Sequence, residues 1–284
     1  MLLPDQLKAL WQHVEQQELS QDEFQSEHDR LLATSRDIWQ GALCLEPHRD
    51  LPESLLAELG AYLHEDAAEI QRRCLHALAS LKDDWERQVV PGDRRSVEQY
   101  YDASETLLYE LTWWHTLSED STPLAYVTAL QFAQRHGCRS YLDFGAGVGA
   151  GGVLFARHGF EVTLADISSP LLRFSRWRLE RRALPARYVD LKNGGQLPGN
   201  TFDIITAMDV FEHLVDPVAT LEQLWETLKP GGFLFARLAA EIDETRPQHI
   251  VQDFEPTFAR LRTLGFTQVW QDDWLWGHRV FRKS

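Results

Sequence analysis

The second half of the chain alternates between short apolar runs and segments long enough to form helices. The apolar runs lie at residues 140–144, 161–165, 186–189, 202–207 and 232–238. Neighbouring parallel strands are joined by crossovers of a dozen or more residues, usually helical, and the segments between these runs have that length. The alternation therefore predicts an α/β fold with a doubly wound, mostly parallel sheet.

The end of the chain departs from this alternation. Residues Phe266–Trp270 and His278–Phe281 form two further runs, with too few residues between them for a crossover helix. They are expected to pair antiparallel, as a terminal hairpin. Together with the five earlier runs they predict a Rossmann-like, seven-stranded sheet that is mostly parallel and ends in an antiparallel hairpin.

The residues before the first strand predict helices only. Ser20 and Glu23 have the spacing of a capping box, in which each side chain bonds the other residue's backbone. Pro52 suits the first turn of another helix. A further helix places Ile70, Cys74, Leu78, Leu81 and Trp85 on one stripe, which predicts a buried face. The sequence therefore predicts an all-α N-terminal domain before the sheet.

A break at Pro91-Gly92-Asp93 separates the first helices from the rest. It divides the chain into a helical domain at residues 1–95 and a second domain at residues 96–284. Because the helical domain precedes an aromatic cluster that contains Tyr100 and Tyr101, it could form a lid or a wall of a binding site. A dimerisation or stabilising domain is an equally weighted alternative, so a homodimer is possible.

Composition excludes several classes of protein. The chain has 44% hydrophobic and 25% charged residues, as soluble globular proteins do, and it contains no apolar run long enough to span a membrane. Its first residues lack the features of a signal peptide. Three widely spaced cysteines fit free thiols in a reducing compartment, so a cytoplasmic location is expected. The net charge of −15 argues against a nucleic-acid partner.

Glycines are concentrated where the first predicted strand ends, in Asp143–Gly152. Glycines there let the backbone turn tightly and approach a ligand closely. The spacing of Gly147, Gly149 and Gly152 also satisfies the pattern that binds dinucleotides. The glycines alone therefore leave the bound nucleotide open.

Acidic residues at the strand ends favour one nucleotide over the other. Asp143 faces the glycine turn in this prediction, where a carboxylate would repel a pyrophosphate but suit an ammonium and a sulfonium group. S-adenosylmethionine carries those two groups and no phosphate. Asp166 ends the second strand, where an acid can accept hydrogen bonds from both ribose hydroxyls. Asp190 ends the third strand, where it could contact the adenine amino group.

From residue 138 to residue 284 the chain resembles the class I S-adenosylmethionine-dependent methyltransferases. The resemblance rests on four motifs in order: Asp143–Gly149 with the later acid Asp166, Phe202–Ile205, Asp209–Leu214, and Leu228–Gly232. No family resemblance is found for residues 1 to about 95.

The resemblance implies a set of cofactor-binding residues. Gly145, Gly147 and Gly149 would cradle the methionine part of the cofactor, Asp166 would bind the ribose, and Ile167 would pack on the adenine. Met208 and Asp209 would line the cofactor. Tyr101 stands where many relatives place an aromatic residue that closes over the donor methyl group.

Methyl transfer to a hydroxyl group requires a base, and histidine is suited to that role near neutral pH. His213 follows the fourth strand, at the sheet edge where ligands bind, and could equally be structural. His249 lies in a polar loop after the fifth strand and is the preferred base. Glu212 and His213 could bind a metal ion, but no third ligand is evident in the sequence, so no metal is predicted.

The predicted function is S-adenosylmethionine-dependent methylation of a small-molecule acceptor, at oxygen, within biosynthesis. A protein or tRNA acceptor is an open alternative. An NAD-dependent oxidoreductase rests only on the glycine spacing, and a catalytically inactive partner subunit is opposed by the full set of cofactor residues.

Overall fold

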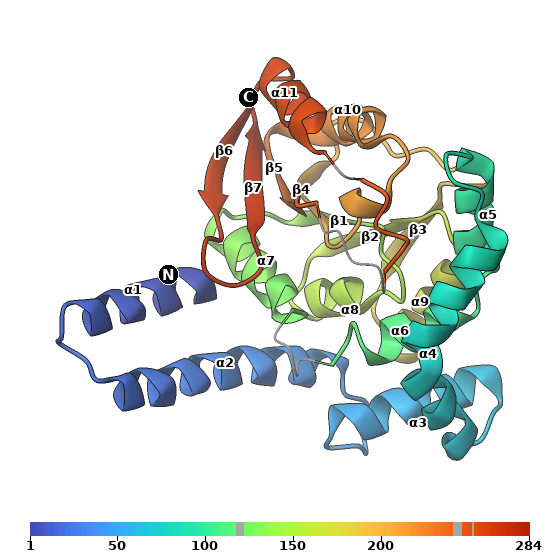
Figure 1. The fold of residues 1–284 in the computed structure, drawn as a ribbon, viewed down its shortest axis with the longest axis horizontal. Helices are drawn as coiled ribbons and strands as arrows, with labels where there is room; N and C mark the ends of the chain where they lie inside the picture. Colours follow the sequence, from blue (N-terminus) through green and yellow to red (C-terminus); the bar gives the residue numbers. More distant parts are fainter. Residues whose placement is uncertain (118–121, 241–245, 252) are drawn as a thin grey trace.

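A seven-stranded sheet lies at the centre of the computed structural model, which describes residues 1–117, 122–240, 246–251 and 253–284 (Figure 1). The strand order is β3-β2-β1-β4-β5-β7-β6. The strands are β1 (Ser140–Phe144), β2 (Glu161–Asp166), β3 (Ala186–Asp190), β4 (Phe202–Ala207), β5 (Leu228–Arg237), β6 (Phe266–Gln271) and β7 (His278–Lys283).

Strands β1 to β5 run parallel, and β7 pairs antiparallel with both β5 and β6. The predicted fold class is therefore confirmed, including the terminal hairpin. The strand order reverses between β1 and β4, which start crossovers to opposite sides. In open α/β sheets such a switch point opens a crevice at the carboxyl ends of the strands, where ligands bind.

Helices cover both faces of the sheet and bury a separate core on each (Figure 1). One face packs against α7 (Leu124–Arg135), α8 (Ala150–Arg157) and α9 (Ser169–Arg181). The other packs against α10 (Pro217–Thr227) and α11 (Glu255–Thr263), with a short 3-10 turn, η1 (Phe211–His213), after β4. Both cores are dominated by buried aliphatic and aromatic side chains, whose removal from water stabilises the fold.

The N-terminal residues form helices, as predicted. They are α1 (Leu3–Glu15), α2 (Gln21–Leu43), α3 (Leu51–Leu63), α4 (Ala67–Gln88), α5 (Arg94–Ala103) and α6 (Thr106–Trp113). The Ser20–Glu23 capping box is present: Ser20 Oγ accepts from the Glu23 N–H at 3.2 Å, and a Glu23 carboxylate oxygen accepts from the Ser20 N–H at 2.9 Å. Pro52 lies in the first turn of α3.

The N-terminal helices share one buried core with the sheet face that carries α7, α8 and α9. The domain boundary at residues 95 and 96 remains a prediction. The predicted stripe on α4 is largely buried, but Leu78 is 39% exposed and lines a cavity together with Leu81. That stripe is therefore more than a packing face. None of the helices in the described part of the chain combines the length and apolar character needed to cross a bilayer.

Candidate active site

A cavity of about 900 Å³ opens at the carboxyl ends of β1 and β4, at the switch point of the sheet. Its wall includes the glycine turn after β1, the residues that follow β2 and β4, and the segment before α11. Helices α4, α5 and α6 close the opposite side. Residues far apart in the sequence therefore meet around one space, which is large enough for a nucleotide together with a second small molecule.

The glycine turn after β1 has a backbone that side chains would disturb. Gly145 and Gly147 both line the cavity, with φ of 70° and 51°. A Cβ atom at Gly145 would also lie 2.5 Å from the Val210 side chain. Glycine is therefore required there both for the left-handed conformation and for space. The turn can bring its backbone close to a ligand, as the sequence predicts.

Asp166 lies beside this turn and is held by backbone donors. Its Oδ2 accepts the Gly147 N–H at 2.8 Å, and its Oδ1 accepts the Ser168 N–H at 2.8 Å. Burial raises the pKa of the carboxyl, whereas these N–H groups act to lower it. Each carboxylate oxygen has a second lone pair, so Asp166 can accept further hydrogen bonds from hydroxyls in the cavity. This geometry fits the predicted contact to a ribose.

The Asp143 carboxylate lies against the glycine-rich segment, since a Cβ atom at Gly151 would be 2.7 Å from its Oδ2, but its direct contact with a cofactor stays a prediction. Its side chain is fully buried, and it is not among the described residues that line the cavity. Its Oδ1 accepts from the Thr206 hydroxyl at 3.0 Å and from the Tyr126 hydroxyl at 3.5 Å. Burial raises the pKa of the Asp143 carboxyl to about 7. Tyr126 does line the cavity, so Asp143 reaches the site through that hydroxyl rather than directly.

Gly149 and Asp190 also lie off the described cavity wall. Gly149 is the N-cap of α8, and a Cβ atom there would lie 2.7 Å from the Ser175 Cβ, so this glycine permits close packing of α8 on α9. The Asp190 carboxylate instead accepts from the Ser169 hydroxyl at 2.7 Å and the Asn193 amide at 2.9 Å. Direct contact of either residue with a cofactor stays a prediction that this geometry does not favour.

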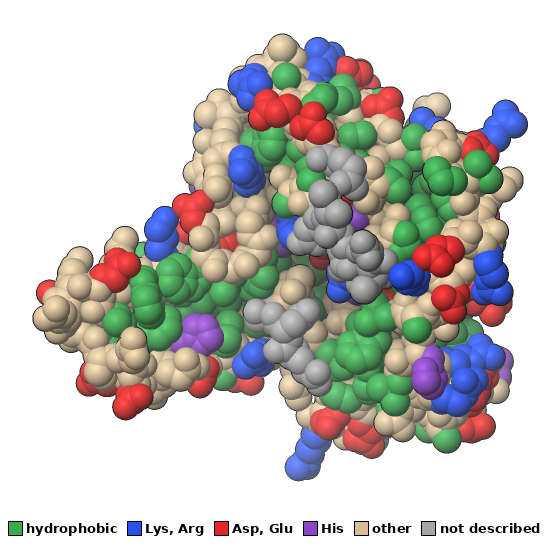
Figure 2. All heavy atoms as spheres, viewed as in Figure 1, with side chains coloured by type: hydrophobic (Ala, Val, Ile, Leu, Met, Phe, Trp, Pro, Cys, Tyr) green, Lys and Arg blue, Asp and Glu red, His purple; other side chains and the backbone are tan. Residues whose placement is uncertain are grey.

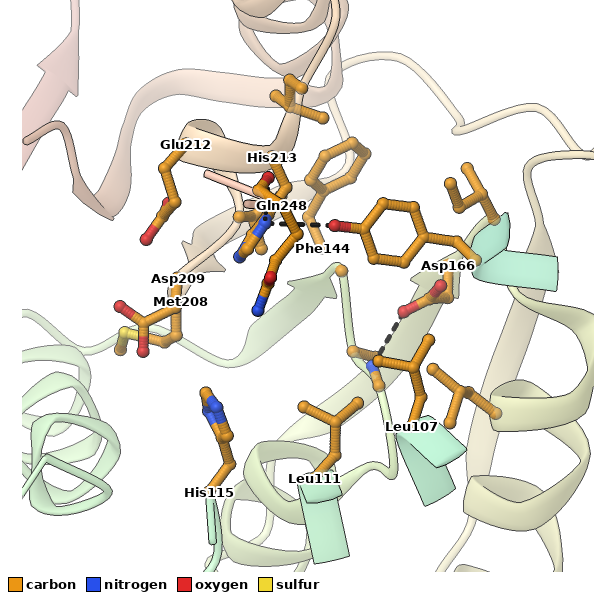
Figure 3. A pocket seen from close by; sticks show the side chains of 18 of the residues that line it. Leu107, Leu111, His115, Phe144, Asp166, Met208, Asp209, Glu212, His213 and Gln248 are labelled. Atoms are coloured by element: carbon orange, nitrogen blue, oxygen red, sulfur yellow. Dashed lines mark hydrogen bonds between the residues drawn. The ribbon is translucent and has the colours of Figure 1, made fainter. Parts of the chain in front are cut away.

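Four other predicted residues line the cavity: Tyr101, Ile167, Met208 and Asp209. Asp209 has a φ of 47°, which turns the chain sharply after β4. Its carboxylate lies 3.7 Å from the Arg237 guanidinium at the end of β5. Figure 3 shows Met208 and Asp209 across the cavity from Asp166. The structure therefore brings these residues into one site with the glycine turn.

Both candidate bases, His213 and His249, line the same cavity. Their rings are in edge-to-face contact, with centroids 4.9 Å apart. The segment that carries His249 is fixed to η1 by its backbone, because the Ile250 and Val251 N–H groups both donate to the Glu212 carbonyl, at 2.9 and 3.1 Å. Residues 241–245, the first part of the predicted polar loop, lie outside the described residues.

The contacts of His213 define its protonation. Its Nδ1 lies 3.0 Å from the Gln248 carbonyl oxygen and 3.1 Å from the Tyr101 hydroxyl. A hydrogen on Nδ1, shared between these two oxygens, satisfies both contacts and leaves Nε2 as an acceptor. Burial, with a smaller effect from the neighbouring His249, lowers the pKa of His213 to about 4. His213 is therefore neutral at physiological pH.

The structure supplies the third potential metal ligand that the sequence does not reveal. Glu212, His213 and His249 offer ligand atoms that all lie within 4.8 Å of one another. The Arg237 guanidinium lies 3.6 Å from the Glu212 carboxylate, on the same side as Asp209. A fixed cation thus already faces both carboxylates.

Further polar residues reach the cavity from segments that sequence reasoning did not select. They include Glu110, His115, Tyr126, Arg237, Gln248 and His278. His115 Nε2 lies 2.8 Å from a Glu110 carboxylate oxygen; although burial opposes it, this pairing raises the pKa of His115 to about 9. The sequence offered two clues to these residues: His115 lies next to the predicted aromatic cluster, and His278 starts the last strand.

The chain is similar to known methyltransferases. Residues 142–234 match the family model described as a methyltransferase domain. The ubiquinone biosynthesis O-methyltransferases of Photorhabdus laumondii and Albidiferax ferrireducens are 29% and 31% identical over 131 and 132 residues. These matches cover 43% of this chain and 54% and 52% of those proteins, so the chain spans about half the length of the curated relatives it matches.

A solved structure shares the fold. It is the 1,6-didemethyltoxoflavin-N1-methyltransferase of Burkholderia thailandensis, determined with 1,6-didemethyltoxoflavin and S-adenosylhomocysteine bound. The TM-score is 0.52 at 18% identity, covering 69% of this chain and 91% of that one. The motif order, the sheet topology with its terminal hairpin and the family match agree. The chain thus carries a methyltransferase domain of the class I S-adenosylmethionine-dependent family.

Proposed function

We propose that this protein transfers a methyl group from S-adenosylmethionine to a hydroxyl group of a small biosynthetic molecule, with His249 as the base. One observation carries the proposal: a single cavity joins the glycine turn and Asp166 to His213 and His249. The first pair of features suits the donor, and the histidines suit an acceptor that must lose a proton.

The residues around the glycine turn fit the proposed cofactor. Gly145 and Gly147 leave room for the methionine part, and the carboxylate of Asp166 can accept from the ribose hydroxyls. Ile167 offers an apolar surface for the adenine. S-adenosylmethionine would supply a methyl group already activated by its positive sulfur. The protein then has to hold acceptor and donor in line and exclude water.

The histidine side of the cavity supports an oxygen acceptor. A hydroxyl must lose its proton during methylation, whereas a neutral amine attacks through its own lone pair. His249 is 8% exposed and lies against His213. Because the pKa of His213 is lowered to about 4, His213 is a poor proton acceptor near neutral pH. The O-methyltransferase relatives named above also favour oxygen. We therefore assign the proton transfer to His249 and the orientation of its ring to His213.

The N-terminal helices support a role as a wall of the acceptor site. Leu78 and Leu81 of α4 and Arg94 at the start of α5 line the cavity. These residues close the side opposite the sheet, so part of the predicted helical domain at residues 1–95 would contact the acceptor or shield it from water.

A small molecule suits the site better than a nucleic acid. On the face in Figure 2, lysine and arginine side chains are scattered among acidic ones rather than gathered in a patch. The net charge of −15 adds repulsion toward phosphates. If the acceptor were instead a protein or a tRNA, the enzyme would methylate that macromolecule and leave small phenols and alcohols unmethylated.

Calorimetric titration tests the cofactor. We expect S-adenosylmethionine and S-adenosylhomocysteine to bind with a Kd of about 1 to 100 μM, close to typical working concentrations of a cofactor. NAD should not bind. Binding of NAD alone would make the oxidoreductase the correct alternative and overturn the proposal.

Substitution of His249 tests the base. A panel of phenols, alcohols, amines and thiols is first screened for release of S-adenosylhomocysteine, and the best hydroxyl acceptor is kept. His249→Ala should lower kcat by about 10²- to 10⁴-fold, the usual worth of a general base, without changing the Kd of S-adenosylhomocysteine. His158→Ala, which changes a histidine that does not line the described cavity, is the control. An unchanged kcat in His249→Ala would contradict the assignment.

A bound metal ion is the alternative chemistry for the same three side chains. The closeness of Glu212, His213 and His249 favours it, whereas the Arg237 guanidinium beside Glu212 favours a site without metal. We expect full activity after dialysis against a chelator. If the activity were lost and returned when a divalent cation was added, a metal ion that activates the acceptor hydroxyl would take the role that we assign to His249.

A further inference from the structure

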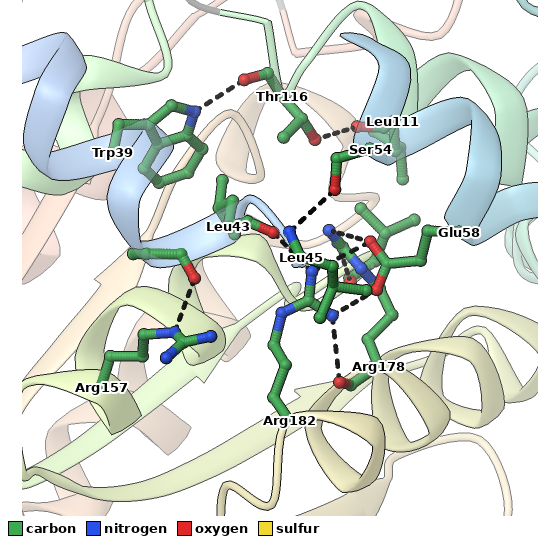
Figure 4. Close-up of polar contacts among 12 residues, drawn as sticks. Trp39, Leu43, Leu45, Ser54, Glu58, Leu111, Thr116, Arg157, Arg178 and Arg182 are labelled. Carbon is green, nitrogen blue, oxygen red and sulfur yellow. Dashed lines mark hydrogen bonds and ion pairs between the residues drawn. The ribbon is translucent and has the colours of Figure 1, made fainter. Parts of the chain in front are cut away.

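A buried carboxylate joins the N-terminal helices to the methyltransferase domain. Glu58 of α3 is 1% exposed and forms ion pairs with Arg178 and Arg182 of α9 (Figure 4). Its Oε2 lies 3.1 Å from an Nη2 atom of each arginine. Three charged side chains thus lie away from water at the contact between two regions of the chain.

The three groups hold one another in the charged state. Burial acts to raise the pKa of the Glu58 carboxyl, but the guanidinium groups of Arg178 and Arg182 keep it below its usual value. Removing one member of such a cluster leaves uncompensated charge in the interior, which destabilises the fold. A loss of stability alone therefore cannot distinguish what each arginine does.

The two arginines have different second partners. Arg178 Nη1 donates to the Val148 carbonyl oxygen at 2.8 Å. Arg182 instead donates to the Leu43 carbonyl at the end of α2, at 2.5 Å, and to the carbonyl of Arg178, at 3.1 Å. Only Arg178 therefore connects Glu58 to the glycine turn.

Val148 lies inside that turn, between Gly147 and Gly149, and lines the cavity. Its carbonyl precedes the N-cap of α8 and so lies outside the hydrogen-bond series of that helix. A buried carbonyl needs a donor, and Arg178 provides one with a full charge. Two further bonds fix neighbouring peptides: Gly147 N–H to Asp166, and Gly149 N–H to the Ala146 carbonyl, both at 2.8 Å.

We propose that Glu58 and Arg178 are positioning residues for cofactor binding. Glu58 orients the Arg178 guanidinium, which fixes the peptide between Val148 and Gly149 and so holds the glycine turn in its binding shape. The proposal rests on the proposed binding of S-adenosylmethionine. It gives the N-terminal helices a role at the donor end of the cavity, in addition to the wall they form opposite the sheet.

Arg178→Gln and Arg182→Gln make a matched pair for the test. Both remove a buried guanidinium from α9 and a partner from Glu58, and both should lower Tm. Titration with S-adenosylhomocysteine should show binding weakened by about tenfold or more in Arg178→Gln relative to Arg182→Gln, as expected for loss of a charge-assisted hydrogen bond that shapes the site. Equal affinities in the two variants would overturn the proposal.

Glu58→Gln tests whether Glu58 acts through Arg178. It should weaken S-adenosylhomocysteine binding when Arg178 is present and have little further effect in Arg178→Gln, because interacting residues are not additive. Arg178→Lys keeps a charge but offers one ammonium to two partners, so part of the affinity should return. Additive losses in the double variant would contradict the proposed route.

Hydrogen exchange of the wild-type protein keeps the proposal testable if the variants do not fold. Coupling is reciprocal, so S-adenosylhomocysteine should slow exchange in α3 but not in α1, which is remote from this cluster. If S-adenosylhomocysteine bound but left exchange in α3 unchanged, this inference would be overturned and the proposed function would stand. A wild-type protein that does not bind S-adenosylhomocysteine would instead overturn the proposed function, and this inference with it.

Discussion

The proposed donor and acceptor ends of the cavity are built in different ways. At the donor end, Gly145, Gly147 and Asp166 lie close in sequence and are positioned by neighbouring parallel strands, β1 and β2. At the acceptor end, His115, His213, His249 and His278 come from four separate segments. The donor end depends on backbone geometry, whereas the acceptor end depends on the tertiary placement of side chains. Binding of the donor and proton transfer from the acceptor should therefore respond to different substitutions.

Asp166→Ala should produce the largest effect on the donor end. It removes a carboxylate that holds the Gly147 N–H and is placed to accept from the ribose. We expect S-adenosylhomocysteine affinity to fall about a hundredfold, the combined worth of two charge-assisted hydrogen bonds. Titration calorimetry measures this effect directly.

Asp190→Ala is the control for Asp166→Ala. Asp190 also ends a strand of the same sheet, but its carboxylate is held by Ser169 and Asn193 away from the described cavity wall. Its loss should change affinity by no more than about threefold, because its side chain is held by Ser169 and Asn193 and not by residues of the glycine turn. Equal losses in the two variants would show that the donor end extends to β3.

Sequence reasoning succeeded where neighbouring residues determine the structure. The apolar runs predicted the strands, and the short connection between β6 and β7 predicted the hairpin. It says less about properties that depend on the surroundings of a side chain. Asp143 follows the expected pattern, yet Tyr126 and Thr206 enclose its carboxylate. Leu78 fits a buried helical stripe but faces the cavity, because the stripe extends beyond the surface that its neighbours cover.

The acceptor end could not be assembled from the sequence for the same reason. Glu212 and His213 are adjacent, but His249 is brought to them by tertiary contacts, among them the hydrogen bonds of the residue 250 and 251 N–H groups to the Glu212 carbonyl. His115 and His278 carry no local pattern that distinguishes them from structural histidines. Their roles depend on the partners that folding provides, such as Glu110 beside His115.

Tyr101→Phe tests the link between the two ends. The Tyr101 hydroxyl contacts His213 at 3.1 Å, while its ring is predicted to close over the donor methyl group. Because the Gln248 carbonyl still holds His213, we expect kcat to fall by only about five- to tenfold, the worth of one neutral hydrogen bond. The Kd of S-adenosylhomocysteine should not change, since the ring remains.

Tyr100→Phe is the matched control for Tyr101→Phe. Tyr100 lies on the same helix and is buried, whereas Tyr101 is partly buried, and the Tyr100 hydroxyl donates to the Leu81 carbonyl at 3.2 Å. Both variants lose one hydroxyl contact, and only Tyr101 reaches His213. A similar loss of kcat in both would mean that the effect is one of helix packing, and that the two ends are not linked through this hydroxyl.

His278 gives the smallest effect, on stability rather than activity. Its ring is 1% exposed, and both ring nitrogens lack a hydrogen-bond partner among the described residues. Burial lowers the pKa of His278 to about 4, against about 6.5 in an unfolded chain. The unfolded state therefore binds a proton between these values that the folded state does not. Protonation of His278 in the unfolded state therefore lowers the free energy of unfolding as the pH falls from 6.5 toward 4. Above pH 6.5 the group is neutral in both states and this loss of stability is absent.

His278→Gln removes this titration. The free energy of unfolding, measured with urea, should fall between pH 7.5 and pH 5.5 in the wild type. The fall in the variant should be about 1 kcal/mol smaller. His76→Gln, on the exposed side of α4, should follow the wild-type curve. If His278→Gln also followed the wild-type curve, the His278 ring of the wild type would bind a proton in the folded state as readily as in the unfolded state. The acceptor end would then be hydrated and open to protons at the position of His278, and its chemistry would be less separate from solvent than that of the donor end.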